Sequence, residues 1–404
     1  MTSGKYTFVD LFSGAGGMSF GFKAHDAFTP RFAVDVEVGK PSSGQGSLEC
    51  NATYKANIGI DVKAADLTTY EPRQLMRDAG LARKELDVLI SCAPCTGFSR
   101  AVNKNHLEDD PRNHLVERSA LFVDALRPAI FVMENARELI HGNFSGHFAA
   151  LKTSLENMGY AVAGRVYMLS RFGLPQARER SIVVGVRSPL SLRTLDELWS
   201  GNAVDAAATT VRRAIAHLPA VKAGAEHPND AMHTSPSFSD PRTLQRLKAI
   251  PRNGGSWADL VGNPRTEDLL VPSMRRSAER GDFGSHPDVY GRLWWDRPCV
   301  TIKRECSHVG NGRYSHPEQD RMCTVRELAL INGFPAGYEF LGSLSNRYRH
   351  IGDAVPPLIS HQLAHLAYWM LAERRPKLAD IVLDGTSLRA TDIARVDQRW
   401  RGGD

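Results

Sequence analysis

The chain has 404 residues, of which 42% are hydrophobic and 24% are charged. This length and composition predict two globular domains, or one large domain with an insertion, and exclude the collagen-like, coiled-coil, mucin-like and disordered classes. Fifty basic and 45 acidic residues give a net charge of +5, which suits a polyanionic partner without requiring one.

The N-terminal half has the pattern of an α/β domain. Short runs of β-branched and aromatic residues alternate with helical stretches, as in a parallel sheet covered on both faces. We expect helices over residues 113–126 and 144–158, ended by Pro128 and Gly159. The expected strands are residues 7–12, 32–36, 87–91, 129–134, 161–169 and 181–186.

A glycine-rich turn, Phe12-Ser-Gly-Ala-Gly-Gly17, follows the first expected strand. Glycines let backbone amides approach a ligand, and the start of the next helix attracts its polar or anionic part. A tight turn without ligand is the alternative. Asp35, with Glu37 behind it, follows about 20 residues later, where a carboxylate can bind ribose hydroxyls. The pair favours a nucleoside-containing cofactor, although the spacing for a dinucleotide is absent.

Cys95 lies beside Pro94 in the loop after the third expected strand. Reactive groups of open α/β sheets lie at the carboxyl ends of strands, so Cys95 is placed to be a nucleophile, whereas Cys92 is expected to pack in the core. Glu134 ends the next strand at the same edge, where it would form a salt bridge or have a raised pKa and donate a proton. Only Cys92 and Cys95 form a CxxC pair, so we expect no metal site.

After about residue 188 the sequence becomes less periodic and rich in Pro, Gly, Ser and Arg, which indicates a second, smaller domain. Residues 241–313 hold thirteen Arg or Lys and eight acidic residues, a surplus that suits phosphate contacts. Arg275 and Arg276 are candidates for guanine or phosphate contacts. Helical periodicity returns at residues 324–332 and 357–372.

Eight motifs, in order, resemble the DNA (cytosine-5-)-methyltransferase family of the bacterial restriction-modification type. The resemblance covers residues 6–187 and 291–372. The motifs are DLFSGAGG from Asp10, the acid Asp35, AADL at 64–67, APCTGFS at 93–99, MENA at 133–136, GLPQARER at 173–180, TVRELALINGFP at 324–335 and IGDAVPP at 351–357.

The resemblance implies an α/β fold with a Rossmann-like class I S-adenosylmethionine-dependent methyltransferase sheet and a smaller target recognition domain. We expect a catalytic and cofactor-binding domain over residues 1–187, a recognition domain over 188–302 and motifs returning to the catalytic domain over 303–373. The role of the tail, 374–404, is open.

It also implies a mechanism. A cytosine leaves the duplex, Cys95 adds to its C6, and Glu134 contacts the N3 edge. C5 then takes the methyl group from S-adenosylmethionine. Arg178 and Arg180, which point to one face if their segment is extended, would position the base and its phosphate.

The resemblance assigns further residues to the two ligands. Phe12 would stack on the adenine, Asp35 would bind the ribose, and the loop 96–112, with Lys104 and His106, would close over DNA or be merely solvated. The full set for the cofactor is Asp10, Phe12, Ser13, Gly14, Gly16, Gly17, Asp35, Val36, Asp66, Leu67, Pro94, Asp353 and Ala354. The set for the substrate is Pro94, Ser99, Arg100, Asn135, Gln176, Arg275 and Arg276.

Two positions depart from the family pattern. Asp353 stands where the family usually has Asn, and this carboxylate would either weaken binding of the methionine carboxylate or engage the sulfonium or amino group. Residues 38–47 form an insert after Asp35, which would be a cofactor lid or have no role.

The expected partner is double-stranded DNA, and a cognate restriction endonuclease would be linked genetically rather than physically. An RNA (tRNA) cytosine-5 methyltransferase and a catalytically inactive DNA-binding regulator are the alternatives. We expect a monomer. Without an apolar run of about 18 residues or a secretory leader, the sequence favours a cytoplasmic protein with no membrane contact.

Overall fold

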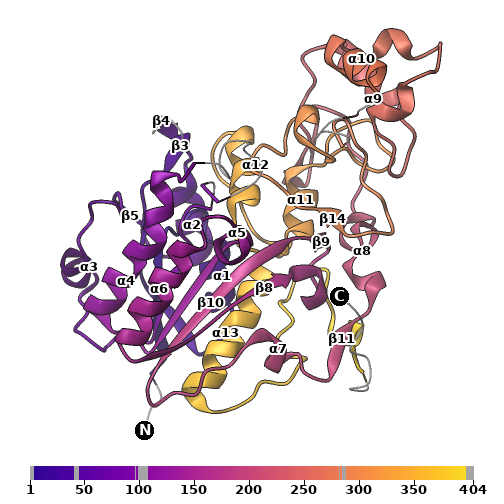
Figure 1. The fold of residues 1–404 in the computed structure, drawn as a ribbon. Coiled ribbons are helices and arrows are strands. Elements are labelled where there is room, and N and C mark those ends of the chain that lie inside the picture. Colours follow the sequence, from indigo (N-terminus) through magenta and orange to yellow (C-terminus); the bar gives the residue numbers. More distant parts are fainter. Residues whose placement is uncertain are drawn as a thin grey trace.

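The computed structural model describes residues 4–40, 45–95, 97–98, 108–281, 283 and 288–396. Its first lobe is built on a seven-stranded sheet with the order β5-β2-β1-β6-β7-β10-β8 (Figure 1). The strands are β1 (Tyr6–Leu11), β2 (Phe28–Asp35), β5 (Lys63–Ala64), β6 (Val88–Ser91), β7 (Ile130–Ala136), β8 (Tyr160–Met168) and β10 (Glu179–Arg187). The expected α/β fold is confirmed.

The sheet is mixed rather than wholly parallel. β2, β1, β6 and β7 pair in parallel, but β10 lies antiparallel to both β7 and β8. The expectation of a parallel sheet was therefore wrong at this edge. β10 follows β8 after a short connection without a crossover helix, and such a connection returns the chain in the opposite direction.

Alternate residues of the central strands face different helices. Phe8, Val88 and Val132 pack on the side of α1 (Gly17–Lys23) and α13 (Pro357–Ala372). Their neighbours Val9, Leu89 and Phe131 pack on the opposite side, because successive strand residues point to opposite faces. The helices on that side are α3 (Pro72–Ala79), α4 (His114–Leu126) and α6 (Gly146–Asn157).

Two glycines let the first helix approach its neighbour closely. A Cβ atom on Gly17 would lie 2.4 Å from the carbonyl oxygen of Val355, and one on Gly21 would lie 2.2 Å from the amide nitrogen of His361. Any larger residue would push α1 away from α13. The start of α1, and with it the glycine-rich turn, is therefore fixed against the segment that begins at Asp353.

The second lobe has a hydrophobic core of its own, which runs from Val211 to Ala354 and includes Trp257, Trp295 and Phe334. Figure 1 shows α9 and α10 far from the sheet, at the outer end of this lobe. Both expected helices near the C-terminus are present, as α11 and α13. The helices of the lobe are α8 (Val211–Ile215), α9 (Pro241–Ala249), α10 (Pro272–Glu279), α11 (Val325–Ile331) and α12 (Leu344–Asp353).

The described part of the tail packs against two earlier segments, β11 (Asn202–Val204) and the start of α13. β15 (Ile393–Arg395) pairs with β11, and Leu388 packs with Leu358. No helix of the described residues is long and apolar enough to cross a membrane. The remaining elements are α2 (Cys50–Ile58), α5 (Glu138–His141), α7 (Leu195–Leu198), β3 (Val38–Lys40), β4 (Gln45–Ser47), β9 (Gln176–Ala177), β12 (Glu226–His227), β13 (Asp230–Thr234) and β14 (Cys299–Val300).

Candidate active site

Cys95 lies four residues beyond β6, at the carboxyl edge of the sheet. Asn135, at the end of β7, donates from Nδ2 to the carbonyl of Ala93 at 2.9 Å and so holds the loop that carries Cys95. Burial raises the pKa of the Cys95 thiol; Arg180 and Arg178 oppose this shift, while Glu134 adds to it. Two cations therefore favour the thiolate at this position. Cys92 packs against the core beneath the loop, as expected.

Glu134 and Arg180 come from neighbouring strands and meet beside Cys95. Arg180 Nε lies 2.9 Å from Glu134 Oε1, although only 7% of Glu134 is exposed. This charge contact lacks hydrogen-bond geometry, so within the described residues the buried Oε1 has no hydrogen-bond partner. A buried carboxylate oxygen that keeps its acceptor capacity is suited to a polar ligand.

Arg178 is almost fully buried, with 2% of its surface exposed. Its Nη1 donates to the carbonyl of Ile302 at 3.0 Å and its Nη2 to that of Ala354 at 3.2 Å. Gln176 accepts from the amide of Ile302 at 2.9 Å. Arg178 and Gln176 therefore fasten the segment around Ile302 to the sheet edge. The Nε of Arg178 is buried and has no hydrogen-bond partner among the described residues.

The glycine-rich turn lies at the same edge, one strand away. Phe12 has a left-handed backbone conformation with φ of 59°, which non-glycine residues rarely adopt and which is common at ligand sites. The hydroxyl of Ser13 is buried and has no partner among the described residues. A free hydroxyl beneath a glycine turn fits the polar end of a nucleoside cofactor.

Asp35 holds the turn and the hairpin β3–β4 together. It accepts from the amide of Gly14 at 2.9 Å and from that of Glu37 at 2.6 Å. Burial raises its pKa, whereas these amides lower it. Beside it, Val36 exposes 48% of its surface, an apolar contact suited to a flat ring. The carboxylate has capacity for a further donor such as a ribose hydroxyl.

The sequence did not single out Arg304, which connects both halves of the site. Arg304 Nη1 pairs with the carboxylate of Asp353, and its Nη2 donates to the carbonyl of Gly39 on β3. No motif marks this arginine. Its partners are distant in the chain, so only the folded structure reveals them.

Other predicted residues occupy varied positions. Asp66 is exposed and caps its own turn by accepting from the amide of Thr68, and Leu67 is buried. Arg275 bonds to the carbonyls of Leu270 and Glu267, and Arg276 is exposed on α10. Ser99, Arg100, Lys104, His106 and part of the insert 38–47 lie outside the described residues.

Three comparisons place these features among known proteins. The model of the C-5 cytosine-specific DNA methylase family matches residues 6–367. The Type II methyltransferase M1.HphI of Haemophilus parahaemolyticus is 32% identical over 89% of this chain and 85% of its own length. The Type II methylase M.HgiDII of Herpetosiphon aurantiacus is 28% identical over 88% of this chain and 93% of its own length.

Solved structures have the same fold. A DNA modification methyltransferase encoded within an E. coli prophage superposes with a TM-score of 0.62 at 21% identity, covering 91% of this chain and 100% of its own. The Dnmt2 methyltransferase of S. pombe gives 0.53 at 16% identity, over 90% of this chain and 98% of its own.

Proposed function

Because the chain belongs to the C-5 cytosine-specific DNA methylase family and is thus a DNA (cytosine-5-)-methyltransferase, we propose how it carries out this reaction. Cys95 bonds to C6 of a cytosine flipped out of double-stranded DNA, and C5 receives a methyl group from S-adenosylmethionine. The observation that supports this most is the convergence of Cys95, Glu134 and Arg180 at the carboxyl edge of the sheet.

Cys95 acts as the nucleophile. Its sulfur forms a bond to C6 while Glu134, whose Oε1 has no hydrogen bond among the described residues, shares a proton with N3 of the ring. Electron density withdrawn toward N3 makes C6 easier to attack, and the addition makes C5 nucleophilic. After methyl transfer, a base accepts the C5 proton, the electrons of the C5–H bond re-form the C5–C6 double bond, and the bond from C6 to the Cys95 sulfur breaks to release the thiolate.

Arg180 and Arg178 have different parts in this scheme. Arg180 neutralises Glu134 at 2.9 Å and stabilises negative charge on the sulfur. Arg178 is fixed by two carbonyls and presents its charge and Nε from a buried position. We assign Arg178 to orienting the site through the segment around Ile302, and Arg180 to contact with the base.

S-adenosylmethionine, when bound, supplies an electrophilic methyl group on a sulfonium. Ser13 and the turn 14–17 bind its amino-acid part, Asp35 binds its ribose, and Phe12 with Val36 hold its adenine. These assignments are supported by the unpartnered Ser13 hydroxyl, the left-handed Phe12 and the exposed Val36. Asp10 and Asp353 are close enough to Asp35 for its charge to raise their pKa values.

The second lobe reads the DNA. Exposed basic residues such as Lys248, Arg265 and Arg276 neutralise phosphates, so affinity falls with salt. Arg292 and Arg313 are instead buried in ion pairs within the lobe. The Type II relatives support a role beside a cognate restriction endonuclease that recognises the same sequence. One chain suffices for one target cytosine, so the enzyme acts as a monomer.

Bisulfite sequencing tests the reaction and reveals the target. Plasmid DNA is taken from a host that lacks cytosine methylation and expresses either the intact chain or its Cys95→Ala variant. Protected cytosines in one fixed context, seen only with the intact chain, are expected. Their absence with soluble protein, or stronger methylation of tRNA than of duplex DNA, would refute the proposal.

A further inference from the structure

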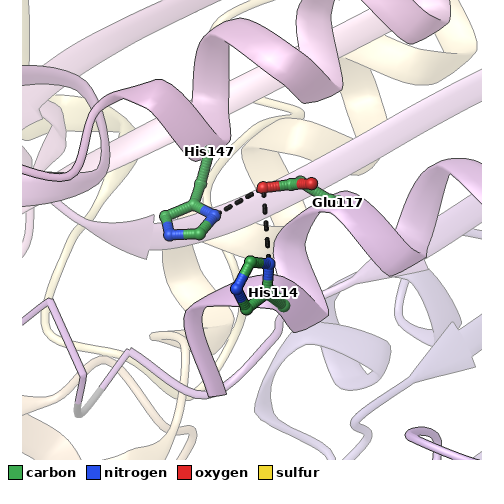
Figure 2. A group of neighbouring side chains, drawn as sticks. All are labelled: His114, Glu117 and His147. Carbon is green, nitrogen blue, oxygen red and sulfur yellow. Dashed lines mark hydrogen bonds and ion pairs between the residues drawn. The ribbon is translucent and has the colours of Figure 1, made fainter. Parts of the chain in front are cut away.

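Two histidines and a glutamate meet where α4, α6 and the segment before η1 (Pro111–Asn113) come together. Figure 2 shows both imidazole rings facing the carboxylate of Glu117. Nδ1 of His147 lies 2.6 Å from Glu117 Oε1, and Nδ1 of His114 lies 3.7 Å from the same oxygen. One ligand atom from each of the three residues lies within 4.8 Å of the other two.

A second carboxylate fixes the buried histidine from the other side. Nε2 of His147 lies 2.9 Å from Asp109 Oδ2, and Asn113 donates from Nδ2 to Asp109 Oδ1 at 2.7 Å. Histidines that ligate metals almost always give their other ring N–H to a carboxylate, which fixes the tautomer and raises the basicity of the ligating nitrogen. Asp109 therefore supplies the outer shell that a metal-binding His147 needs.

We propose that His114, Glu117 and His147 form a binding site for a divalent transition-metal ion of the zinc type, with water as the remaining ligand. Two imidazoles and one carboxylate are a donor set that zinc prefers. His114 and Glu117 are one helical turn apart on α4, and His147 comes from the start of α6. Tetrahedral ligands at 2.0–2.2 Å from zinc are roughly 3.3 Å apart, so the two spacings to Glu117 Oε1, 2.6 and 3.7 Å, need only small shifts.

The proposed metal site is accessible from solution and lies close to the segment behind Cys95. His147 is buried, whereas the side chain of His114 is 67% exposed and admits the ion from solution. The ion joins α4, α6 and the segment that begins at Asp109. This segment leads into η1, where Asn113 and Asp110 lie directly against Gly97, two residues beyond Cys95. The metal thus fixes the structure behind the nucleophile and takes no part in the reaction.

The competing arrangement has a proton in place of the metal. A His147 ring protonated at both nitrogens could donate to Glu117 and Asp109 at the same time. A titration with zinc distinguishes the metal site from the protonated arrangement. Only the metal site binds zinc in a defined ratio, and only its binding depends on the exposed His114. The readout does not depend on methyl transfer, so a failed metal site leaves the proposed function standing.

The experiment uses the full chain without an affinity tag, freed of metal with a chelator. Calorimetry with Zn²⁺ alone is expected to give one equivalent per chain, and Co²⁺ to give the visible bands of a tetrahedral site. His114→Ala should abolish both signals without affecting folding, because its side chain is exposed. His141→Ala, an exposed histidine on α5, should change neither.

The Asp109→Asn variant tests whether the outer carboxylate supports zinc binding. Loss of the outer carboxylate should weaken zinc binding about 10- to 100-fold while keeping the one-to-one ratio. The proposal is overturned if the intact chain binds no equivalent of zinc, or if His114→Ala binds zinc as tightly as the intact chain.

Discussion

Arg304 forms an ion pair with Asp353, the last residue of α12. The same guanidinium bonds to the carbonyl of Gly39, so it holds the hairpin after Asp35 against the end of α12. The charge of Asp353 is therefore compensated within the chain. Gly352 lets the backbone before Arg304 approach the end of α12, because a Cβ on Gly352 would lie 2.4 Å from the carbonyl oxygen of Lys303.

We expect the Arg304–Asp353 ion pair to affect the affinity for the cofactor. Arg304→Gln leaves the Asp353 carboxylate uncompensated beside the site. S-adenosylmethionine should then bind about tenfold more weakly, a loss of roughly 1.4 kcal/mol in binding free energy. The double variant Arg304→Gln/Asp353→Asn should recover most of the loss. Calorimetry of the two variants checks this.

Asp353→Asn alone is the control for that experiment. If the carboxylate repelled the cofactor, the single variant would bind more tightly than the intact chain; with Arg304 as its partner, we expect no gain. A double variant as weak as Arg304→Gln would show that Arg304 acts on the hairpin rather than on the charge of Asp353.

Cys95→Ser should lower the rate of methyl transfer at least about 10³-fold, whereas the binding of DNA and cofactor should persist. The hydroxyl is a far weaker nucleophile than a thiolate. Cys92→Ala is the matched control, because burial holds the pKa of Cys92 far above its ordinary value and the thiol packs against the core. Transfer of labelled methyl to DNA measures both, and activity in the Ser variant would contradict the nucleophile assignment.

Glu134→Gln should lower kcat by roughly 10²- to 10⁴-fold, because an amide cannot supply the proton or the charge at N3. Glu179→Gln offers a close comparison, since Glu179 pairs with Arg137 at 2.6 Å one residue before Arg180. Its kcat should stay within about twofold of the intact enzyme. Equal losses in both variants would point to a general effect of charge on the sheet.

Asp10 should make stability depend on pH. Burial raises its pKa from 3.8 to about 7; the Ser19 hydrogen bond lowers it and Asp35 raises it. The folded state therefore favours the neutral acid, and this contribution is complete below about pH 4 and is lost as pH rises toward about 7. Its size is of the order of 4 kcal/mol.

Between about pH 4 and about pH 7 the urea midpoint of Asp10→Asn should therefore rise relative to that of the intact chain, because only the intact chain loses the contribution of Asp10. Glu339→Gln, at an exposed position, should keep the slope of the intact chain. Equal slopes for Asp10→Asn and the intact chain would mean that Asp10 is already ionised when folded.

The sequence by itself determined the strands of the catalytic half and the edge at which Cys95 and Glu134 meet. Alternation of apolar residues is written within a few neighbouring positions, and the end of a buried strand marks where a side chain can face a ligand. The glycine turn and Asp35 were predictable for the same reason, because each depends on its nearest neighbours.

Only the tertiary structure decided the direction of β10, the carbonyl partners of Arg178, the Arg304–Asp353 pair and the meeting of His147 with His114. Each joins residues that no local pattern connects. Arg304 and Gly39 are 265 positions apart, and Arg178 and Ala354 are 176 apart. Such contacts depend on the path of the whole chain through two hydrophobic cores, because a hydrogen bond forms only where packing has already brought its partners together.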